Sequence, residues 1–222
     1  MTTTSQSSSL FDALRADAVR DPAQLREIYE MPSEAAVHKQ VDRIHEVSRR
    51  LIGCSSFVLI ASADAEGRCD VSPRGGPAGF VAVLDEHTLA IPDATGNKRL
   101  DTLQNIIATG QAGLVFLIPG RNDTLRVNGR ACVSTDPQLL AQLTAVGKPP
   151  RSAIVVRVEE VYGHCPKSLM RGFVWKPEQW LPKDAVPSSA EVTLSHLSTS
   201  LDGLTVETIE QYERESLLHR YE

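Results

Sequence analysis

The sequence predicts a mostly β protein with flanking helices, an α+β fold in which antiparallel pairing dominates. Between positions 56 and 162, runs typical of strands are separated by turn residues, and most of these turns are too short for a parallel crossover. Apolar residues at helical spacing precede this region, interrupt it and follow it. The middle of the chain is therefore expected to form one antiparallel domain with helices around it.

Helices are expected before the first strand. Met1–Ser9 is a polar tail typical of disorder, and short helices are predicted over Phe11–Val19 and Pro22–Tyr29. A longer helix is predicted over Glu34–Leu51, because its apolar residues recur at helical steps and Ser33 offers a cap. No chemistry is visible in these helices.

Two hairpins are predicted next. Ser56–Ser62 is typical of a strand that the DAEG turn reverses into Arg68–Ser72, and Phe80–Leu84 pairs with Thr88–Ile91 around the DEH turn. Between the hairpins, SPRGGP combines prolines with two glycines, which indicates an irregular backbone that can approach a flat ligand closely. Arg74 is the cation in this bend. Considered alone, the segment fits a surface turn with a solvated arginine better than a ligand site.

The stretch Ile91–Gly129 carries the clearest functional signal. A PDATG loop opens it, and Asn97, Lys98 and Arg99 follow at the start of an amphipathic helical pattern. Unpaired amides in the first turn of a helix favour an anion, and cations placed there oppose the helix dipole unless an anion lies between them. The pattern therefore predicts a phosphate site on this first turn. The alternative is a solvated helix start.

Two strands follow this helix. AGLVFLI, residues 112–118, is typical of a buried strand, and the PGRND turn leads to a second strand over Thr124–Ser134. Apolar residues alternate along this second strand with a polar face that carries Arg126, Asn128 and Arg130. Arg126 could meet a bound ligand or its phosphate, or face solvent.

A helix over Pro137–Val146, ended by GKPP, and a strand over Ser152–Tyr162 are expected next. The adjacent acids Glu159 and Glu160 point to opposite faces of this strand, which disfavours a paired-carboxylate acid/base site. The chain ends with a proline-rich connection and a polar amphipathic helix over Thr205–Tyr221.

The stretch HCPKSLMRGFVW is the second informative one. Pro166 can open a helix, and Lys167, Arg171 and Trp175 then fall four residues apart on one face. Two cations and a large aromatic side chain could hold an anionic planar ligand by charge and stacking. The alternative is an exposed face with Trp175 as an anchor between subunits.

Several of these segments together resemble a known family. GNKRLDTLQNI, GLVFLIPG, TLRVNGRA, DVSPRGGPAGFV and HCPKSLMRGFVW are similar in order and spacing to the pyridoxamine 5'-phosphate oxidase-like superfamily of flavin-binding split β-barrels, within a bacterial branch of unsettled substrate. The resemblance covers roughly Ser55–Trp175. It implies a homodimer that holds flavin mononucleotide (FMN) at the subunit interface, with Lys167, Arg171 and Trp175 completing the site from the second subunit.

The residue chemistry and the resemblance together define a candidate cofactor-binding set and no catalytic acid or base. The set comprises Ser72, Pro73, Arg74, Pro92, Asp93, Asn97, Lys98, Arg99, Arg126, Lys167, Arg171 and Trp175. The expected organisation is a polar tail and short helix (1–20), a helical cover (21–54), the flavin-binding split barrel (55–176), and a proline-rich connection with a C-terminal helix (177–222).

The function implied by the resemblance is that of an FMN-dependent oxidoreductase acting on a small redox substrate, with NAD(P)H as a candidate electron donor. Pyridoxamine phosphate is disfavoured as the substrate. Pyridoxamine phosphate oxidases end with an arginine-containing substrate segment, which TVETIEQYERESLLHRYE does not match. The alternatives are a flavin- or haem-binding or sensing module, a deazaflavin-dependent reductase, and a structural dimer without cofactor. The chain carries no GxGxxG sequence, so no resident dinucleotide domain is expected.

The composition of the chain bears on its partners, on metal binding and on its location in the cell. A net charge of −5 and a pI near 5.7 argue against nucleic-acid and anionic-membrane partners. The four cysteines form no CxxC pair, and the histidines have no ligand spacing, so no metal site is expected. The polar start MTTTSQSSS lacks the features of a signal peptide, and no apolar run is long enough to span a membrane. A cytoplasmic protein is the expectation.

Overall fold

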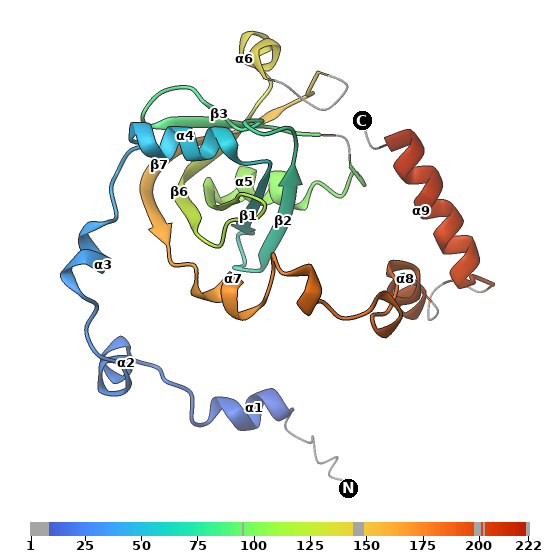
Figure 1. Cartoon of the computed structure of the whole chain (residues 1–222), viewed down its shortest axis with the longest axis horizontal. Coiled ribbons are helices and arrows are strands. Elements are labelled where there is room, and N and C mark those ends of the chain that lie inside the picture. Colours follow the sequence, from blue (N-terminus) through green and yellow to red (C-terminus); the bar gives the residue numbers. More distant parts are fainter. Residues whose placement is uncertain (1–8, 95, 144–148, 198–200, 202, 221–222) are drawn as a thin grey trace, which may run out of the picture. The chain divides into compact units, whose positions relative to one another are not determined.

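The computed structural model describes residues 9–94, 96–143, 149–197, 201 and 203–220 (Figure 1). These residues belong to two units, Met1–Lys39 and Gln40–Glu222. Four sequence expectations lie wholly or partly outside the described residues. They are the polar tail, the PDATG loop at Thr95, the end of the helix before GKPP, and the last residue of the C-terminal helix.

The first unit consists of three short helices, each capped by a polar side chain. They are α1 (Leu10–Arg15), α2 (Pro22–Ile28) and α3 (Glu34–His38), with Ser9, Asp21 and Ser33 as their N-caps. None of the three helices contains a buried residue.

The longer helix predicted over Glu34–Leu51 is wrong, because the helical pattern is interrupted by tertiary pairing. α3 ends at His38, and the next helix, α4 (Glu46–Cys54), begins only after an extended segment. In that segment Val41 forms a β-bridge with Val161, and the amide of Ile44 donates to the Glu86 carbonyl. Two apolar residues of the predicted helix, Val41 and Ile44, are therefore used to attach this segment to the sheet and its β3–β4 turn.

The second unit is built on one seven-stranded sheet in the order β2-β1-β5-β6-β7-β4-β3. All six neighbouring pairs are antiparallel, which confirms the predicted mostly β, antiparallel split-barrel class with flanking helices. The strands are β1 (Phe57–Ala63), β2 (Cys69–Gly75), β3 (Ala82–Val83), β4 (Thr88–Pro92), β5 (Gln111–Leu117), β6 (Thr124–Ser134) and β7 (Ala153–His164).

The SPRGGP segment is more regular than its composition predicts. Instead of bending, the chain from Ser72 to Gly75 completes β2, and Pro73 pairs with Leu59 while Arg74 pairs with Val58. β2 lies at the edge of the sheet and has a neighbouring strand on one side only. A proline is tolerated there, because no strand on the open side requires its missing N–H. The expectation of an irregular backbone here is therefore wrong up to Gly75.

The core lies on one face of the sheet, closed by two helices. Val58, Ile60, Leu114, Phe116 and Val127 are among its fully buried side chains. Ile52 of α4 and Ile106 of α5 (Asp101–Thr109) are buried in the same cluster. α5 packs against β1 and β2 (Figure 1), so the helix that follows the cationic loop is anchored on this face.

The remaining helices follow β6 or β7 in the chain. They are α6 (Pro137–Gln142), α7 (Lys167–Arg171), two short 3-10 helices (Pro177–Gln179 and Lys183–Ala185), α8 (Ser189–Leu197) and α9 (Val206–Arg220). Ala190 of α8 and Ile209 of α9 are buried where these two helices pack together. In the parts of the chain that the structure describes, none of the helices combines the length and the hydrophobicity needed to cross a lipid bilayer.

Candidate functional site

The connection from β4 to α5 is attached to edge strand β2 near both of its ends. Near its start, the Asp93 Oδ1 accepts a hydrogen bond of 2.7 Å from the Arg74 Nη1. Near its other end, the Thr102 Oγ1 donates to the Asp70 Oδ2 over 2.9 Å. Since β2 and the end of β4 lie at opposite sides of the sheet order, these contacts bridge the opening of the split barrel.

Arg74 and Asp93 form a mostly buried ion pair. Their side chains are 20% and 16% exposed, and the Arg74 Nε is buried without a hydrogen-bond partner. Arg74 lies on the same face of β2 as Ser72, because these residues pair with Val58 and Ile60 of the buried face. Part of the guanidinium is therefore still free to donate to another group on this side of the sheet.

The cationic loop has an unusual backbone. Lys98 and Leu100 both have φ of +63°, a left-handed conformation that residues other than glycine rarely adopt. Between them, the Arg99 amide is held by the Asn97 Oδ1 at 3.0 Å. Such strain persists only where surrounding structure enforces it, and it is enriched at ligand sites.

The sequence pattern predicted the cations on the first turn of the helix, but the structure places them before the helix. Leu100 is the N-cap of α5, and the helix begins at Asp101. No side chain caps the helix at Leu100, so its first amides lack the usual polar partner. The left-handed turn at Leu100 is what moves Lys98 and Arg99 off the helix, to the chain directly before its N-terminus.

Carboxylates offset part of the positive charge in this loop. The Arg99 Nε lies 2.8 Å from the Asp101 Oδ2, and this hydrogen bond, together with the charges of Asp101 and more distant Asp70, raises the pKa of the Arg99 guanidinium. Lys98 is exposed and has no ion pair among the described residues. Lys98 is thus immediately available to an anion, whereas the Nε of Arg99 is already engaged by Asp101.

Pro73 and Arg126 lie on the opposite face of the sheet from Ser72 and Arg74. A row of directly paired residues runs across this outer face from Pro73 to Tyr162, through Leu59, Val115 and Arg126. The Arg126 guanidinium carbon lies 5.9 Å from the centre of the Tyr162 ring, and the Arg126 Nε is buried without a partner. The candidate set is therefore divided between two faces.

The helix α7 does not carry all three residues expected on it. Lys167 and Arg171 are exposed on α7, which ends at Arg171, so Trp175 lies beyond the helix and the common face is wrong. Gly172 caps the helix and Phe173 adopts a φ of +50°, which redirects the chain. The Trp175 indole N–H donates to the Arg121 carbonyl over 2.6 Å, in the turn between β5 and β6.

Two residues near the loop, Asp70 and Thr102, were not among the sequence candidates. Thr102 is only 3% exposed although its side chain is polar, and it lies beside the buried Leu103 on α5. A threonine on the apolar side of a predicted helix was the available signal. Nothing in the sequence indicates that its partner is Asp70.

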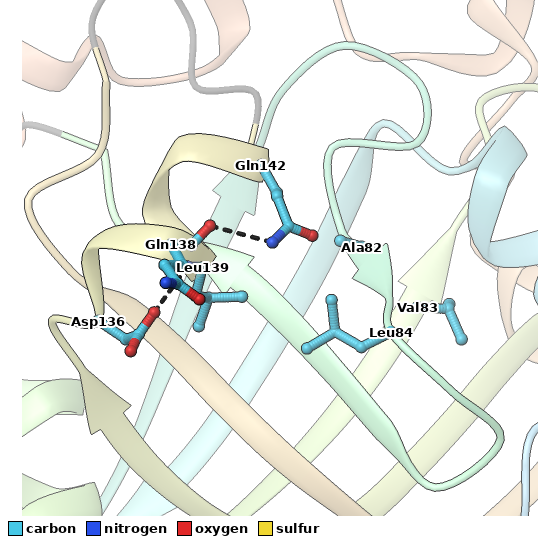
Figure 2. A pocket seen from close by; sticks show the side chains of 7 residues that line it. All are labelled: Ala82, Val83, Leu84, Asp136, Gln138, Leu139 and Gln142. Carbon is cyan, nitrogen blue, oxygen red and sulfur yellow. Dashed lines mark hydrogen bonds between the residues drawn. The ribbon is translucent and has the colours of Figure 1, made fainter.

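A shallow hollow lies elsewhere, between β3 and α6 (Figure 2). Figure 2 shows its lining residues, Ala82, Val83, Leu84, Asp136, Gln138, Leu139 and Gln142. The Asp136 carboxylate accepts from the Leu139 amide at 2.8 Å and so caps α6, and the Gln142 side chain bonds to the Gln138 carbonyl. None of the candidate residues lines this hollow. Among the described residues, no group of three or more His, Cys, Asp or Glu side chains could hold a metal ion.

Fold and site together define a split β-barrel protein with a strained cationic loop beside the edge of the sheet. The family model for pyridoxamine 5'-phosphate oxidase matches residues 44–165, and the chain belongs to this family. The match includes all seven strands of the sheet, from the segment before α4 to the end of β7.

Solved structures with a similar fold include three bacterial proteins. HupZ of Group A Streptococcus is 19% identical, with 55% of this chain and 99% of that chain covered and a TM-score of 0.43. HutZ of Vibrio cholerae, a heme storage protein, is 12% identical, with 55% and 94% covered and a TM-score of 0.37. An FAD binding protein of Mycobacterium smegmatis is 14% identical, with 56% and 97% covered and a TM-score of 0.39. No curated protein matches the chain.

Proposed function

We propose that this protein binds FMN between two copies of the chain and uses it in the oxidation or reduction of a small molecule. The observation that carries the proposal is the loop of Asn97, Lys98 and Arg99, held in a strained conformation before the uncapped start of α5. Exposed cations next to free helix amides favour a phosphate group. The buried, partner-free Nε of Arg74 supplies a further donor near the same edge of the sheet.

The roles of the residues follow from their positions. Asn97, Lys98 and Arg99 hold the phosphate. Ser72 lies between Asp70 and Arg74, on the same face of β2 as both of these residues, which attach the β4–α5 connection. Pro92 ends β4, and Asp93 orients Arg74 along the flavin ring. Bound FMN would supply hydride and electron transfer at its ring, while these side chains provide orientation and a positive charge that favours the reduced, anionic ring.

A second copy of the chain is the proposed partner of the outer face. Phe57 is 36% exposed and Val71 is 60% exposed on this face, next to the half-buried Leu59, Val115 and Leu117. A contiguous apolar surface of this kind favours association. Pro73 and Arg126 belong to this face, so in the proposed dimer they contact the cofactor of the neighbouring site. Lys167, Arg171 and Trp175 approach the cofactor from the second copy, as the family resemblance implies.

Asp101 is expected to weaken FMN binding by competing for Arg99. Asp101→Asn removes a carboxylate that lies 2.8 Å from the Arg99 Nε, and it should tighten FMN binding by about twofold to fivefold. The gain is small because both side chains are solvent-exposed, where water and salt weaken such pairs. Titration of flavin fluorescence measures it. A weaker affinity in Asp101→Asn would contradict the proposed place of the phosphate.

The visible absorption spectrum of the purified protein tests the proposed function, followed by mass spectrometry of the small molecule released on denaturation. Two flavin bands and released FMN are the expected result, and reduction by NAD(P)H would then be assayed. A Soret band would show that the bound cofactor is haem and not FMN. A single band at shorter wavelength with a released deazaflavin would favour a deazaflavin reductase. A colourless protein that fails to bind added FMN would overturn the proposal.

A further inference from the structure

We infer that Thr102, acting through Asp70, is a positioning residue that sets the cationic loop for the cofactor phosphate. The inference rests on the proposed function, because it assigns the loop the same ligand. It adds two residues that do not touch the phosphate themselves. Their role is to hold the start of α5, and thus the end of the loop, at a fixed place along β2.

The geometry of the two attachments supports this role. Asp70 and Arg74 lie on one face of β2, four residues and about 13 Å apart along the strand. Arg74 holds Asp93, before the loop, and Asp70 holds Thr102, after it. The loop cations therefore lie in a segment whose two ends are each bonded to the same strand.

Because Thr102 is buried, its hydrogen bond to Asp70 fixes the position of the start of α5. Thr102 is only 3% exposed, so its hydroxyl has little access to water as a substitute partner. Thr102 is the second residue of α5, immediately after the turn at Leu100. Losing this bond would free the first turn of the helix to shift, and the left-handed turn that carries Lys98 and Arg99 would shift with it.

α5 has a second polar attachment that serves as an internal comparison. The Asn105 Nδ2 donates to the Ser62 Oγ at 3.1 Å, about one turn further from the loop. Ser62 is 8% exposed, so this bond is also sheltered from water. Both bonds join α5 to the β1–β2 hairpin, but only the Thr102 bond lies at the loop end of the helix. A purely structural role would make the two bonds equivalent.

The test compares affinities for FMN and for riboflavin, which lacks the phosphate. Thr102→Val keeps the shape of the side chain and removes the donor. It should weaken FMN binding about tenfold while changing riboflavin binding less than twofold. Thr102→Ser keeps the hydroxyl and should restore the preference for FMN. Asn105→Ala is the matched control, with a similar loss in thermal stability and an unchanged ratio of the two affinities.

A second variant covers the case in which Thr102→Val does not fold. Asp70→Ala removes the acceptor of Thr102 and also a carboxylate near the loop. Electrostatics alone would make FMN bind more tightly to this variant, because a negative charge is lost beside an anion site. A weaker preference for FMN would therefore support the positioning role, and a stronger preference would contradict it.

The outcomes separate this inference from the proposed function. If the unmodified protein binds FMN no better than riboflavin, the phosphate site itself is wrong and the inference falls with it. If the protein prefers FMN, Lys98→Ala removes the preference, and Thr102→Val leaves it intact, then only the positioning role of Thr102 is wrong.

Discussion

Lys98→Ala combined with Arg99→Ala is expected to weaken FMN binding by roughly 100-fold with little loss of folding stability. Charge-assisted contacts to a phosphate contribute about 1.5–3 kcal/mol each, and the lower end applies because both side chains are exposed. The sum of about 3 kcal/mol corresponds to roughly two orders of magnitude in the dissociation constant. Isothermal titration of the cofactor-free protein with FMN measures the change.

Two controls make this result specific. Riboflavin lacks the phosphate, so its affinity should change by less than about threefold in the same double variant. Lys183→Ala combined with Arg214→Ala removes the same net charge from exposed positions outside the sheet, and FMN affinity should stay unchanged. Equal losses of FMN affinity in both double variants would mean that general electrostatic attraction, and not the loop, binds the cofactor.

Gly129→Ala is expected to lower the free energy of unfolding by about 3 kcal/mol, a large fraction of the roughly 5–15 kcal/mol that stabilises a typical protein. A Cβ added at Gly129 would overlap the backbone carbonyl oxygen of Arg157 on the neighbouring strand. Backbone cannot move aside as a side chain can. The register of β6 and β7 shifts at Asn128 and Gly129, where Glu159 is the additional residue of a bulge. The midpoint of urea unfolding measures the loss.

Gly163→Ala is the matched control for this substitution. Gly163 also lies in the β6–β7 ladder, opposite Leu125, but a Cβ added there would meet no atom within 4 Å. Its unfolding midpoint should equal or exceed that of the unmodified protein, since alanine lowers the entropy of the unfolded chain. Similar midpoints for the two variants would show that the strand pair relaxes around Gly129, which would contradict the expected clash.

The strands of this protein could be predicted because their signals are local. Thr124–Ser134 has the bounds that its alternation of apolar and polar residues predicted, since a strand with one buried face imposes that period on the chain. The buried run that forms β5 and the short turns between hairpins are equally local. The family could also be recognised from the sequence. The segments around the cationic loop follow one another in the family's order of loop, helix, strand, turn and strand.

The antiparallel fold class, most of the strands and a cationic loop before an amphipathic helix could be predicted, since each depends on residues that are neighbours in the chain. Three arrangements follow only from how the chain packs: Asp93 meets Arg74, Thr102 meets Asp70, and Pro73 faces away from Ser72. It also divided the predicted Glu34–Leu51 helix at the strand-like bridge of Val41. Each of these features joins segments far apart in sequence or depends on which face of the sheet is buried. Neither can be deduced from the periodicity of residues along one segment.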